Sequence, residues 1–234
     1  MCVILVCPPK VRPTDEILRA CHDANPHGAG VAWRERNRVH WRKNLQVGQV
    51  ARLIRDVKGE VVIHFRWASV GGIKPRLCHP FPVSHTARLS LEGKAKSVLF
   101  HNGTWGGWEE ALDRLVSLGQ HDDLDGAMSD TRAAAVLVDH LGESVLERLP
   151  GRWVLMGQKA TKLCGEWEEF RGMKVSNTHF IHRLEPAKKI WGAYPQSADK
   201  QAQARHEAYA ARMGQLSLMF GPKHQHPDPE KTKK

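Results

Sequence analysis

The sequence predicts an α+β fold built on antiparallel sheet, and three observations support this prediction. Residues 29–34 and 38–42 are β-prone segments separated by a short polar turn, the pattern of a strand pair. The segment EVVIHFR at 60–66 is rich in β-branched and aromatic residues. Strands and helices follow one another without the strict alternation of a parallel sheet, which favours a layered α+β architecture.

The N-terminal elements can be placed in chain order. A buried strand is predicted at 2–7 and ends before Pro8-Pro9. A helix is predicted to begin at Thr14, and a second helix covers 47–57. Residues 67–95 are rich in Gly, Pro and polar side chains, so they are predicted to be mostly loop.

The later elements are predicted from the same helical and strand patterns. Helices are predicted at about 107–118 and at 129–148, the second capped by Ser129 or Asp130. Strands are predicted at 96–101, 151–158 and 173–177, with one more around 163–167. Beyond residue 186 the composition changes to a polar, Ala-rich helix and a Pro- and Lys-rich end. The sequence therefore predicts a folded domain at 2–185 and a basic helical and flexible tail at 186–234.

Composition excludes several classes of protein. Of the 234 residues, 41% are hydrophobic and 26% are charged, which is the balance of a globular chain. There is no apolar run of about 18 residues, and the start of the chain lacks the basic leader of a signal peptide. Five cysteines without a CxxC pair argue against a disulfide framework or zinc finger, so a cytoplasmic location, no metal and no cofactor are expected.

The net charge of +10 is distributed unevenly along the chain. Residues 186–234 hold nine Lys/Arg and four Asp/Glu, and this excess of five positive charges is half of the total. Such a tail attracts polyanions, including nucleic acid, over a long range. A solvated tail with no partner explains the same charge.

Cys2 is the first residue along the chain that could take part in a reaction. If Met1 is removed, Cys2 carries a thiol and a free α-amine, and this amine titrates near neutral pH at about 7.7–8.0. One residue would then supply both a nucleophile and its general base. The alternative is that Cys2 only begins a buried strand.

Two further segments carry polar residues next to strands. In HFRWASVGG at 64–72, a strand end delivers Arg66, whose guanidinium suits bidentate recognition of a carboxylate. The alternative is a surface arginine on an edge strand. In CHPFPV at 78–83, Cys78 and His79 lack the partner pair that a zinc site requires.

Two motifs in the second half supply donors and a carboxylate. In FHNGTW at 100–105, Asn102 and Gly103 form a turn signal, and they also offer the amide and the unobstructed N–H of an oxyanion hole. In MSDTR at 128–132, Asp130 fits a helix cap as well as a carboxylate that binds a substrate ammonium group.

These motifs, together with NPHGAGVAW at 25–33, occur in an order that resembles the class II glutamine amidotransferases. The glutaminase domain of that family is an N-terminal-nucleophile (Ntn) hydrolase, and the likeness is strongest to its stand-alone type. The resemblance covers roughly residues 2–180. It implies a four-layer αββα sandwich with mainly antiparallel sheets.

The resemblance also implies a role for each matched residue. Cys2 would be the nucleophile, with its own amine as base, and Asn102 and Gly103 would form the oxyanion hole. Arg66 would bind the α-carboxylate of glutamine and Asp130 its α-ammonium, while Trp67, Ser69 and His79 would line or support the pocket. Two departures are the absence of Gly after the cysteine, where Val3-Ile4 stand, and Leu77 in place of an Asn before CHPF.

The sequence therefore favours a glutaminase subunit that supplies ammonia to a partner enzyme, because nothing after residue 186 is large enough for an acceptor domain. A second interpretation is an Ntn amidohydrolase that acts on a γ-glutamyl or related small amide without a partner. A third is a non-catalytic, basic protein that binds nucleic acid. Membrane binding is not expected.

The tail contains one further motif. The segment QLSLMF at 215–220 resembles the peptide by which bacterial replication and repair proteins bind the sliding clamp. Gln215, Leu216, Leu218 and Phe220 would make that contact. The alternative is that these side chains pack back on the domain. This alternative is favoured, because six-residue matches arise by chance.

Overall fold

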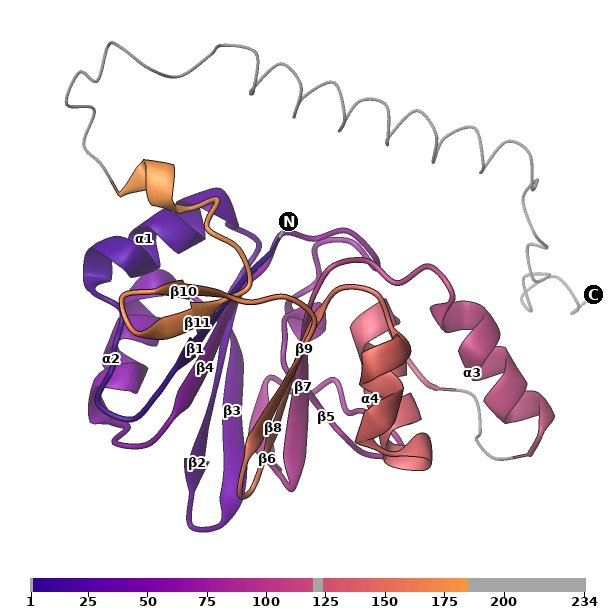
Figure 1. The fold of residues 1–234 in the computed structure, drawn as a ribbon. Helices are drawn as coiled ribbons and strands as arrows, with labels where there is room; N and C mark the ends of the chain where they lie inside the picture. The colour runs from indigo at the N-terminus through magenta and orange to yellow at the C-terminus, as the bar shows by residue number, and fades with distance from the viewer. Residues whose placement is uncertain (1, 120–123, 185–234) are drawn as a thin grey trace, which may run out of the picture. The chain divides into compact units, whose positions relative to one another are not determined.

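The computed structural model describes residues 2–119 and 124–184, and these residues form two sheets and the helices that cover them (Figure 1). The tail predicted at 186–234, its helix at 198–213 and the QLSLMF segment lie outside the described residues. The domain boundary therefore stays a prediction.

The first sheet has seven strands, all paired antiparallel. In spatial order they are β10 (Glu168–Phe170), β11 (Met173–Val175), β1 (Val3–Cys7), β4 (Val61–Phe65), β2 (Ala29–Glu35), β3 (Arg38–Leu45) and β6 (Glu92–Ala95). The second sheet has four strands, also antiparallel. In order they are β5 (Phe81–Pro82), β7 (Ser97–Asn102), β8 (Arg152–Gly157) and β9 (Thr161–Cys164).

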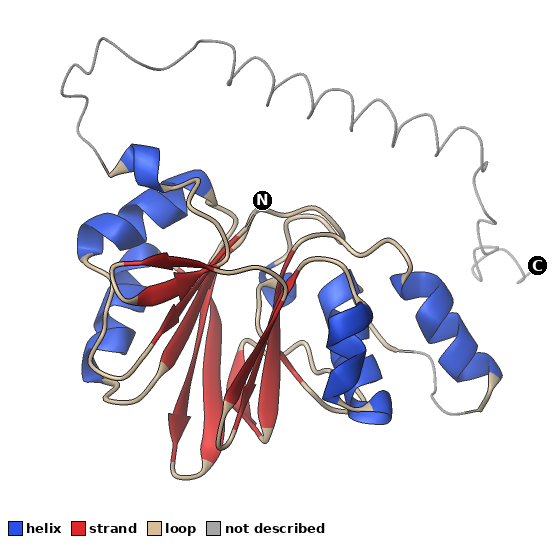
Figure 2. Cartoon of the chain, viewed as in Figure 1, coloured by secondary structure: helices blue, strands red, loops and turns tan. Residues whose placement is uncertain are grey.

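The helices and sheets are stacked in layers (Figure 2), and three apolar clusters fill the spaces between them. In the first, α1 (Asp15–Ala24) and α2 (Val47–Asp56) cover the outer face of the seven-stranded sheet. In the second, α3 (Trp108–Ser117) and α4 (Asp130–Leu141) cover the four-stranded sheet. The third lies between the two sheets. The predicted four-layer αββα sandwich is confirmed.

The alternation of side chains along β1 builds two of these clusters at once. Val3 and Leu5 point to the helical layer, whereas Ile4 and Val6 point to the opposite sheet. All four are buried, as expected for a strand covered on both faces. The Val3-Ile4 pair that departs from the family pattern therefore serves strand packing.

One prediction of secondary structure was wrong. The helix predicted at 129–148 ends at Leu141, because Gly142 takes a φ of +83° and a separate 3₁₀ segment, η2 (Glu143–Arg148), follows. The region 67–95 is mostly loop, as predicted, and it also contains β5, β6 and a 3₁₀ turn, η1 (Pro75–Leu77). These strands are short edge strands, so their sequences carry little periodicity.

The glycines of the HGAG motif allow the 78–80 segment to approach β2. A Cβ on Gly30 would collide with the His79 carbonyl, and one on Gly28 would lie 2.7 Å from Cys78 Sγ. Gly28 also has a φ of +104°, which other residues rarely adopt. These two positions therefore require glycine for the CHPF segment to pack where it does.

Lys43 is an unusual member of the interior. It lies on β3, is 3% exposed, and places Nζ 3.4 Å from the Pro80 carbonyl and 4.3 Å from the centroid of the Phe81 ring. Burial, together with nearby Arg132 and Arg66, lowers its pKa to about 7, although Cys78 acts in the opposite direction.

Substituting Lys43 tests this burial. The unfolded chain holds the lysine proton up to its ordinary pKa of 10.5, whereas the folded chain releases it near pH 7. Stability from this group therefore rises with pH between these values, by about 1.4 kcal/mol per pH unit. We expect Lys43→Met to have a higher free energy of unfolding than the wild type at pH 7, and this difference should vanish by pH 9.5, as measured by urea unfolding. A difference that does not change with pH would contradict a buried lysine.

Candidate functional site

The residues singled out from the sequence meet at one end of the sandwich. Val3 pairs with Phe65, so the start of β1 and the end of β4 bring Cys2 and Arg66 to the same edge. The ends of β7 and β11 reach this edge as well, since Ser176 bonds to both Ile4 and Asn102. The site is thus built from the termini of strands in both sheets.

One pocket at this edge has an empty volume of about 300 Å³, including the space at its mouth. Its lining includes seven of the eight predicted site residues: Cys2, Arg66, Trp67, Ser69, His79, Gly103 and Asp130. The eighth, Asn102, lies directly before Gly103 and is 1% exposed. The sequence did not predict the other lining residues, which are Val70, Leu77, His101, Ser129 and Thr131.

Cys2 is held by backbone groups on both sides. Its Sγ lies 3.3 Å from the Trp67 N–H, which donates to it, and 3.4 Å from the Trp67 carbonyl. Asn177 Nδ2 donates to the Cys2 carbonyl at 2.7 Å. Burial raises the pKa of the Cys2 thiol, and the Trp67 N–H and nearby Arg66 only partly oppose this effect. The thiol therefore needs a base before it can attack.

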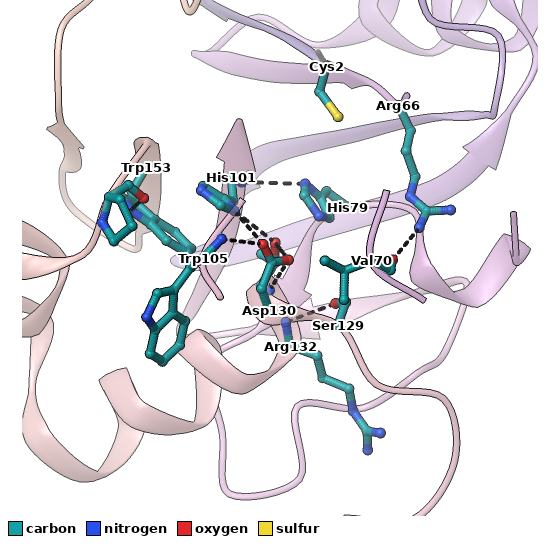
Figure 3. A network of polar contacts seen from close by, with 12 residues as sticks. Cys2, Arg66, Val70, His79, His101, Trp105, Ser129, Asp130, Arg132 and Trp153 are labelled. Atoms are coloured by element: carbon teal, nitrogen blue, oxygen red, sulfur yellow. Dashed lines mark hydrogen bonds and ion pairs between the residues drawn. The ribbon is translucent and has the colours of Figure 1, made fainter. Parts of the chain in front are cut away.

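Arg66 is a buried cation without an anionic partner among the described residues. Its side chain enters the site from the end of β4 (Figure 3). Nη2 donates to the Val70 carbonyl at 3.4 Å, whereas Nη1 is buried and has no hydrogen-bond partner. Burial lowers the pKa of Arg66, but a guanidinium stays charged at neutral pH. A buried unpaired charge is costly, so this position favours an anionic ligand.

Asp130 supplies the opposite charge from the other half of the sandwich (Figure 3). It is the first residue of α4, and Ser129 caps that helix by accepting from the Arg132 N–H. The carboxylate accepts the N–H of Trp105 at 3.0 Å and that of Thr131 at 2.7 Å. Burial alone would raise its pKa, but His101 and these N–H groups bring the pKa of Asp130 below its ordinary value. The carboxylate is therefore ionised at neutral pH.

A row of three buried histidines lies under the pocket. The ring of His64 is 4.2 Å from that of His79, whose Nδ1 accepts the backbone N–H of His101. His101 stacks on Trp153 at 3.7 Å and places Nδ1 3.4 Å from Asp130. Burial lowers the pKa of His64 to about 3 and that of His79 well below its ordinary value. Both rings are neutral, so they add no positive charge beside Arg66.

Asn102 reaches across to the nucleophile strand through Ser176. Asn102 Nδ2 lies 2.8 Å from Ser176 Oγ, which also accepts the Ile4 N–H at 2.9 Å. The sequence analysis missed Ser176 and Asn177, because a Ser-Asn pair after a short strand is an ordinary turn signal. Only the packing of β11 against β1 shows that both residues touch the site.

Within residues 2–119 and 124–184, no group of three or more His, Cys, Asp or Glu side chains is arranged to hold a metal ion. The same residues contain no helix that is both long and apolar enough to cross a membrane.

The fold is shared with two solved structures. Glutamine phosphoribosylpyrophosphate (PRPP) amidotransferase from B. subtilis, solved with ADP and GMP, matches with a TM-score of 0.53 and 15% identity. A structure of the allosteric regulatory enzyme of purine biosynthesis matches with a TM-score of 0.55 and 18% identity. Each match covers 79% of this chain and 43% of the other. The chain has the fold predicted from its resemblance to the class II glutaminase domain.

The chain spans less than half of the length of either of these proteins. No protein-family model matches the sequence, and no curated protein matches it. At these identities the likeness extends to the fold, so the chemistry of the site must be argued from its own residues.

Replacing Asp130 tests the electrostatic account of the site. Asp130→Asn removes the charge that accepts two N–H groups, and its amide would turn a donor toward one of them. We expect the free energy of unfolding to fall by about 3 kcal/mol at pH 7, because hydrogen bonds to a charged acceptor contribute about 1.5–3 kcal/mol. Because the pKa of Asp130 lies below its ordinary value of 3.8, the loss should persist down to that pH and shrink in stronger acid.

Asp139, exposed at the far end of the same helix, provides the control. Asp139→Asn should change stability by less than about 0.5 kcal/mol, as is usual for surface positions. If both substitutions changed the free energy of unfolding equally in chemical denaturation, the Asp130 carboxylate would contribute no more than an exposed helix cap.

Proposed function

We propose that this chain is the glutaminase component of a glutamine amidotransferase, which releases ammonia from glutamine through a thioester on Cys2. The observation that carries the proposal is the pairing of charges around the Cys2 thiol. Arg66 offers a buried guanidinium with one free edge, and Asp130 offers an ionised carboxylate in the same pocket. A free α-amino acid is a zwitterion, so it needs one cation and one anion to bind.

The proposed reaction begins once Met1 has been removed. The α-amine of Cys2 takes the thiol proton, and the sulfur attacks the side-chain carbonyl of glutamine. Asn102 and the Gly103 N–H would stabilise the oxyanion. Ammonia leaves with the transferred proton and a γ-glutamyl thioester remains on Cys2. Water then hydrolyses the thioester, releasing glutamate and restoring the thiol.

Other predicted residues shape the pocket in this proposal. Trp67 holds Sγ through its backbone, while Ser69 and His79 line the walls. Leu77 also lines the pocket, so the position where the family has an Asn presents an apolar surface here. The ammonia would pass to an acceptor enzyme in a partner chain. The enzymatic class and the partner both remain part of the proposal.

Truncated substrates test the charge pairing. The wild type should prefer glutamine over its decarboxylated analogue by about 100-fold in kcat/KM, since a charge-assisted bidentate pair contributes up to about 3 kcal/mol. Arg66→Gln should lose most of this preference, mainly through a higher KM for glutamine. Glutamate release in a coupled assay measures both values.

Arg76→Gln is the matched control, because Arg76 is an exposed arginine on η1 near the pocket. It should keep the wild-type preference. If Arg66→Gln also keeps it, the guanidinium does not bind the carboxylate. Hydrolysis of a γ-glutamyl amide in preference to glutamine would instead support an amidohydrolase without an acceptor.

A further inference from the structure

Ser176 occupies a position that links the nucleophile strand to the proposed oxyanion hole. It is completely buried at the end of β11. Its Oγ receives the Ile4 N–H, two residues after Cys2, at 2.9 Å. The same oxygen lies 2.8 Å from Asn102 Nδ2. A single hydroxyl therefore contacts both strands that carry the proposed catalytic groups.

The hydrogen bonds around this hydroxyl do not balance as drawn. With two N–H donors on Oγ, the hydroxyl proton of Ser176 has no acceptor among the described residues. At the same time, Asn102 Oδ1 is buried and has no hydrogen-bond partner. An unmade bond in the interior costs about 1–3 kcal/mol. A hydrogen-bond donor without an acceptor and an acceptor without a donor thus lie on neighbouring side chains.

A half-turn of the Asn102 amide pairs the Ser176 hydroxyl proton with Oδ1 and moves the buried position without a partner from Oδ1 to Nδ2. The two ends of an amide have the same shape, so the hydrogen-bond network decides which end faces Ser176. After the turn, Ser176 still accepts the Ile4 N–H and donates its own proton to Asn102 Oδ1. The Ile4 N–H is a donor and cannot accept the hydroxyl proton. Asn102 Oδ1 is therefore the acceptor of that proton. The amide Nδ2 then faces away from Ser176.

We propose that Ser176 is a positioning residue, which holds the Asn102 amide with its oxygen bound and its N–H₂ group free for the oxyanion. This inference rests on the proposed function, because it concerns the donor of that reaction. An oxyanion needs a donor that is fixed before charge develops. Through Ser176, the register of the Cys2 strand and the direction of that donor depend on the same oxygen atom.

A double-mutant cycle tests the proposal in the full-length protein. Asn102→Ala should lower kcat for glutamine by about 100- to 1,000-fold, as loss of an oxyanion donor does. Ser176→Ala should lower kcat by at least about 10-fold with KM within threefold. Because Ser176 acts through Asn102, the double variant should be no slower than Asn102→Ala alone. Additive losses would overturn the proposal.

Thr178→Ala is the control, since this nearby hydroxyl bonds to the exposed Glu168 and does not touch the site. It should keep wild-type kcat and KM. Thermal unfolding of each variant separates loss of catalysis from loss of fold.

The amide orientation can also be measured without activity. In the NMR spectrum of the wild type, we expect the side-chain N–H₂ protons of Asn102 to show no strong nuclear Overhauser effect to the Ser176 β-protons. A strong effect would place Nδ2 against the hydroxyl and overturn the proposal. A wild type without glutaminase activity would contradict the proposed function, and the orientation would still be decided by this spectrum.

Discussion

The face-to-face packing of the two sheets is the constraint on which the site depends. Ile4 and Val62 from one sheet contact Phe100 and Val154 from the other within a single apolar cluster. Burial of this cluster fixes the distance between β1 and β7, the strands that end at the pocket. Cys2 and Gly103, which are far apart in the chain, can therefore line the same pocket. The polar side chains that line the pocket lie where this apolar layer ends.

At that edge the protein buries charges that it does not neutralise internally. Asp130 is surrounded by N–H donors and a histidine, whereas Arg66 keeps one buried guanidinium edge without a partner. The buried rings of His64 and His79 are neutral and add no charge to the site. A zwitterionic ligand would pair with both groups and offset the cost of burying them. The hydrogen bonds to Asp130 and the neutral state of these histidines explain why a polar site can persist between two sheets.

The sequence predicted most of the fold because its strands are apolar on both faces and its helices carry caps. The strand pairs, the helix after Thr14 and the end of β7 were placed within a few residues. The short edge strands β6 and β10 were missed, because pairing with a neighbour defines them rather than their own pattern. The break at Gly142 was missed because the apolar periodicity continues past it.

The site was less accessible from sequence for a different reason. Residues inside motifs, such as Arg66 and Asn102, stand next to recognisable strand ends. Ser176 and Asn177 lie in an ordinary segment, and only tertiary contacts bring them to the site.

The most direct test of the account is the intact mass of the purified protein before and after treatment with 6-diazo-5-oxo-L-norleucine, a reactive glutamine analogue. The account predicts a starting mass without Met1, followed by a single adduct that the Cys2→Ala variant does not form. A protein that retains Met1, or an adduct that survives the loss of Cys2, would contradict an N-terminal cysteine nucleophile in a glutamine-shaped site.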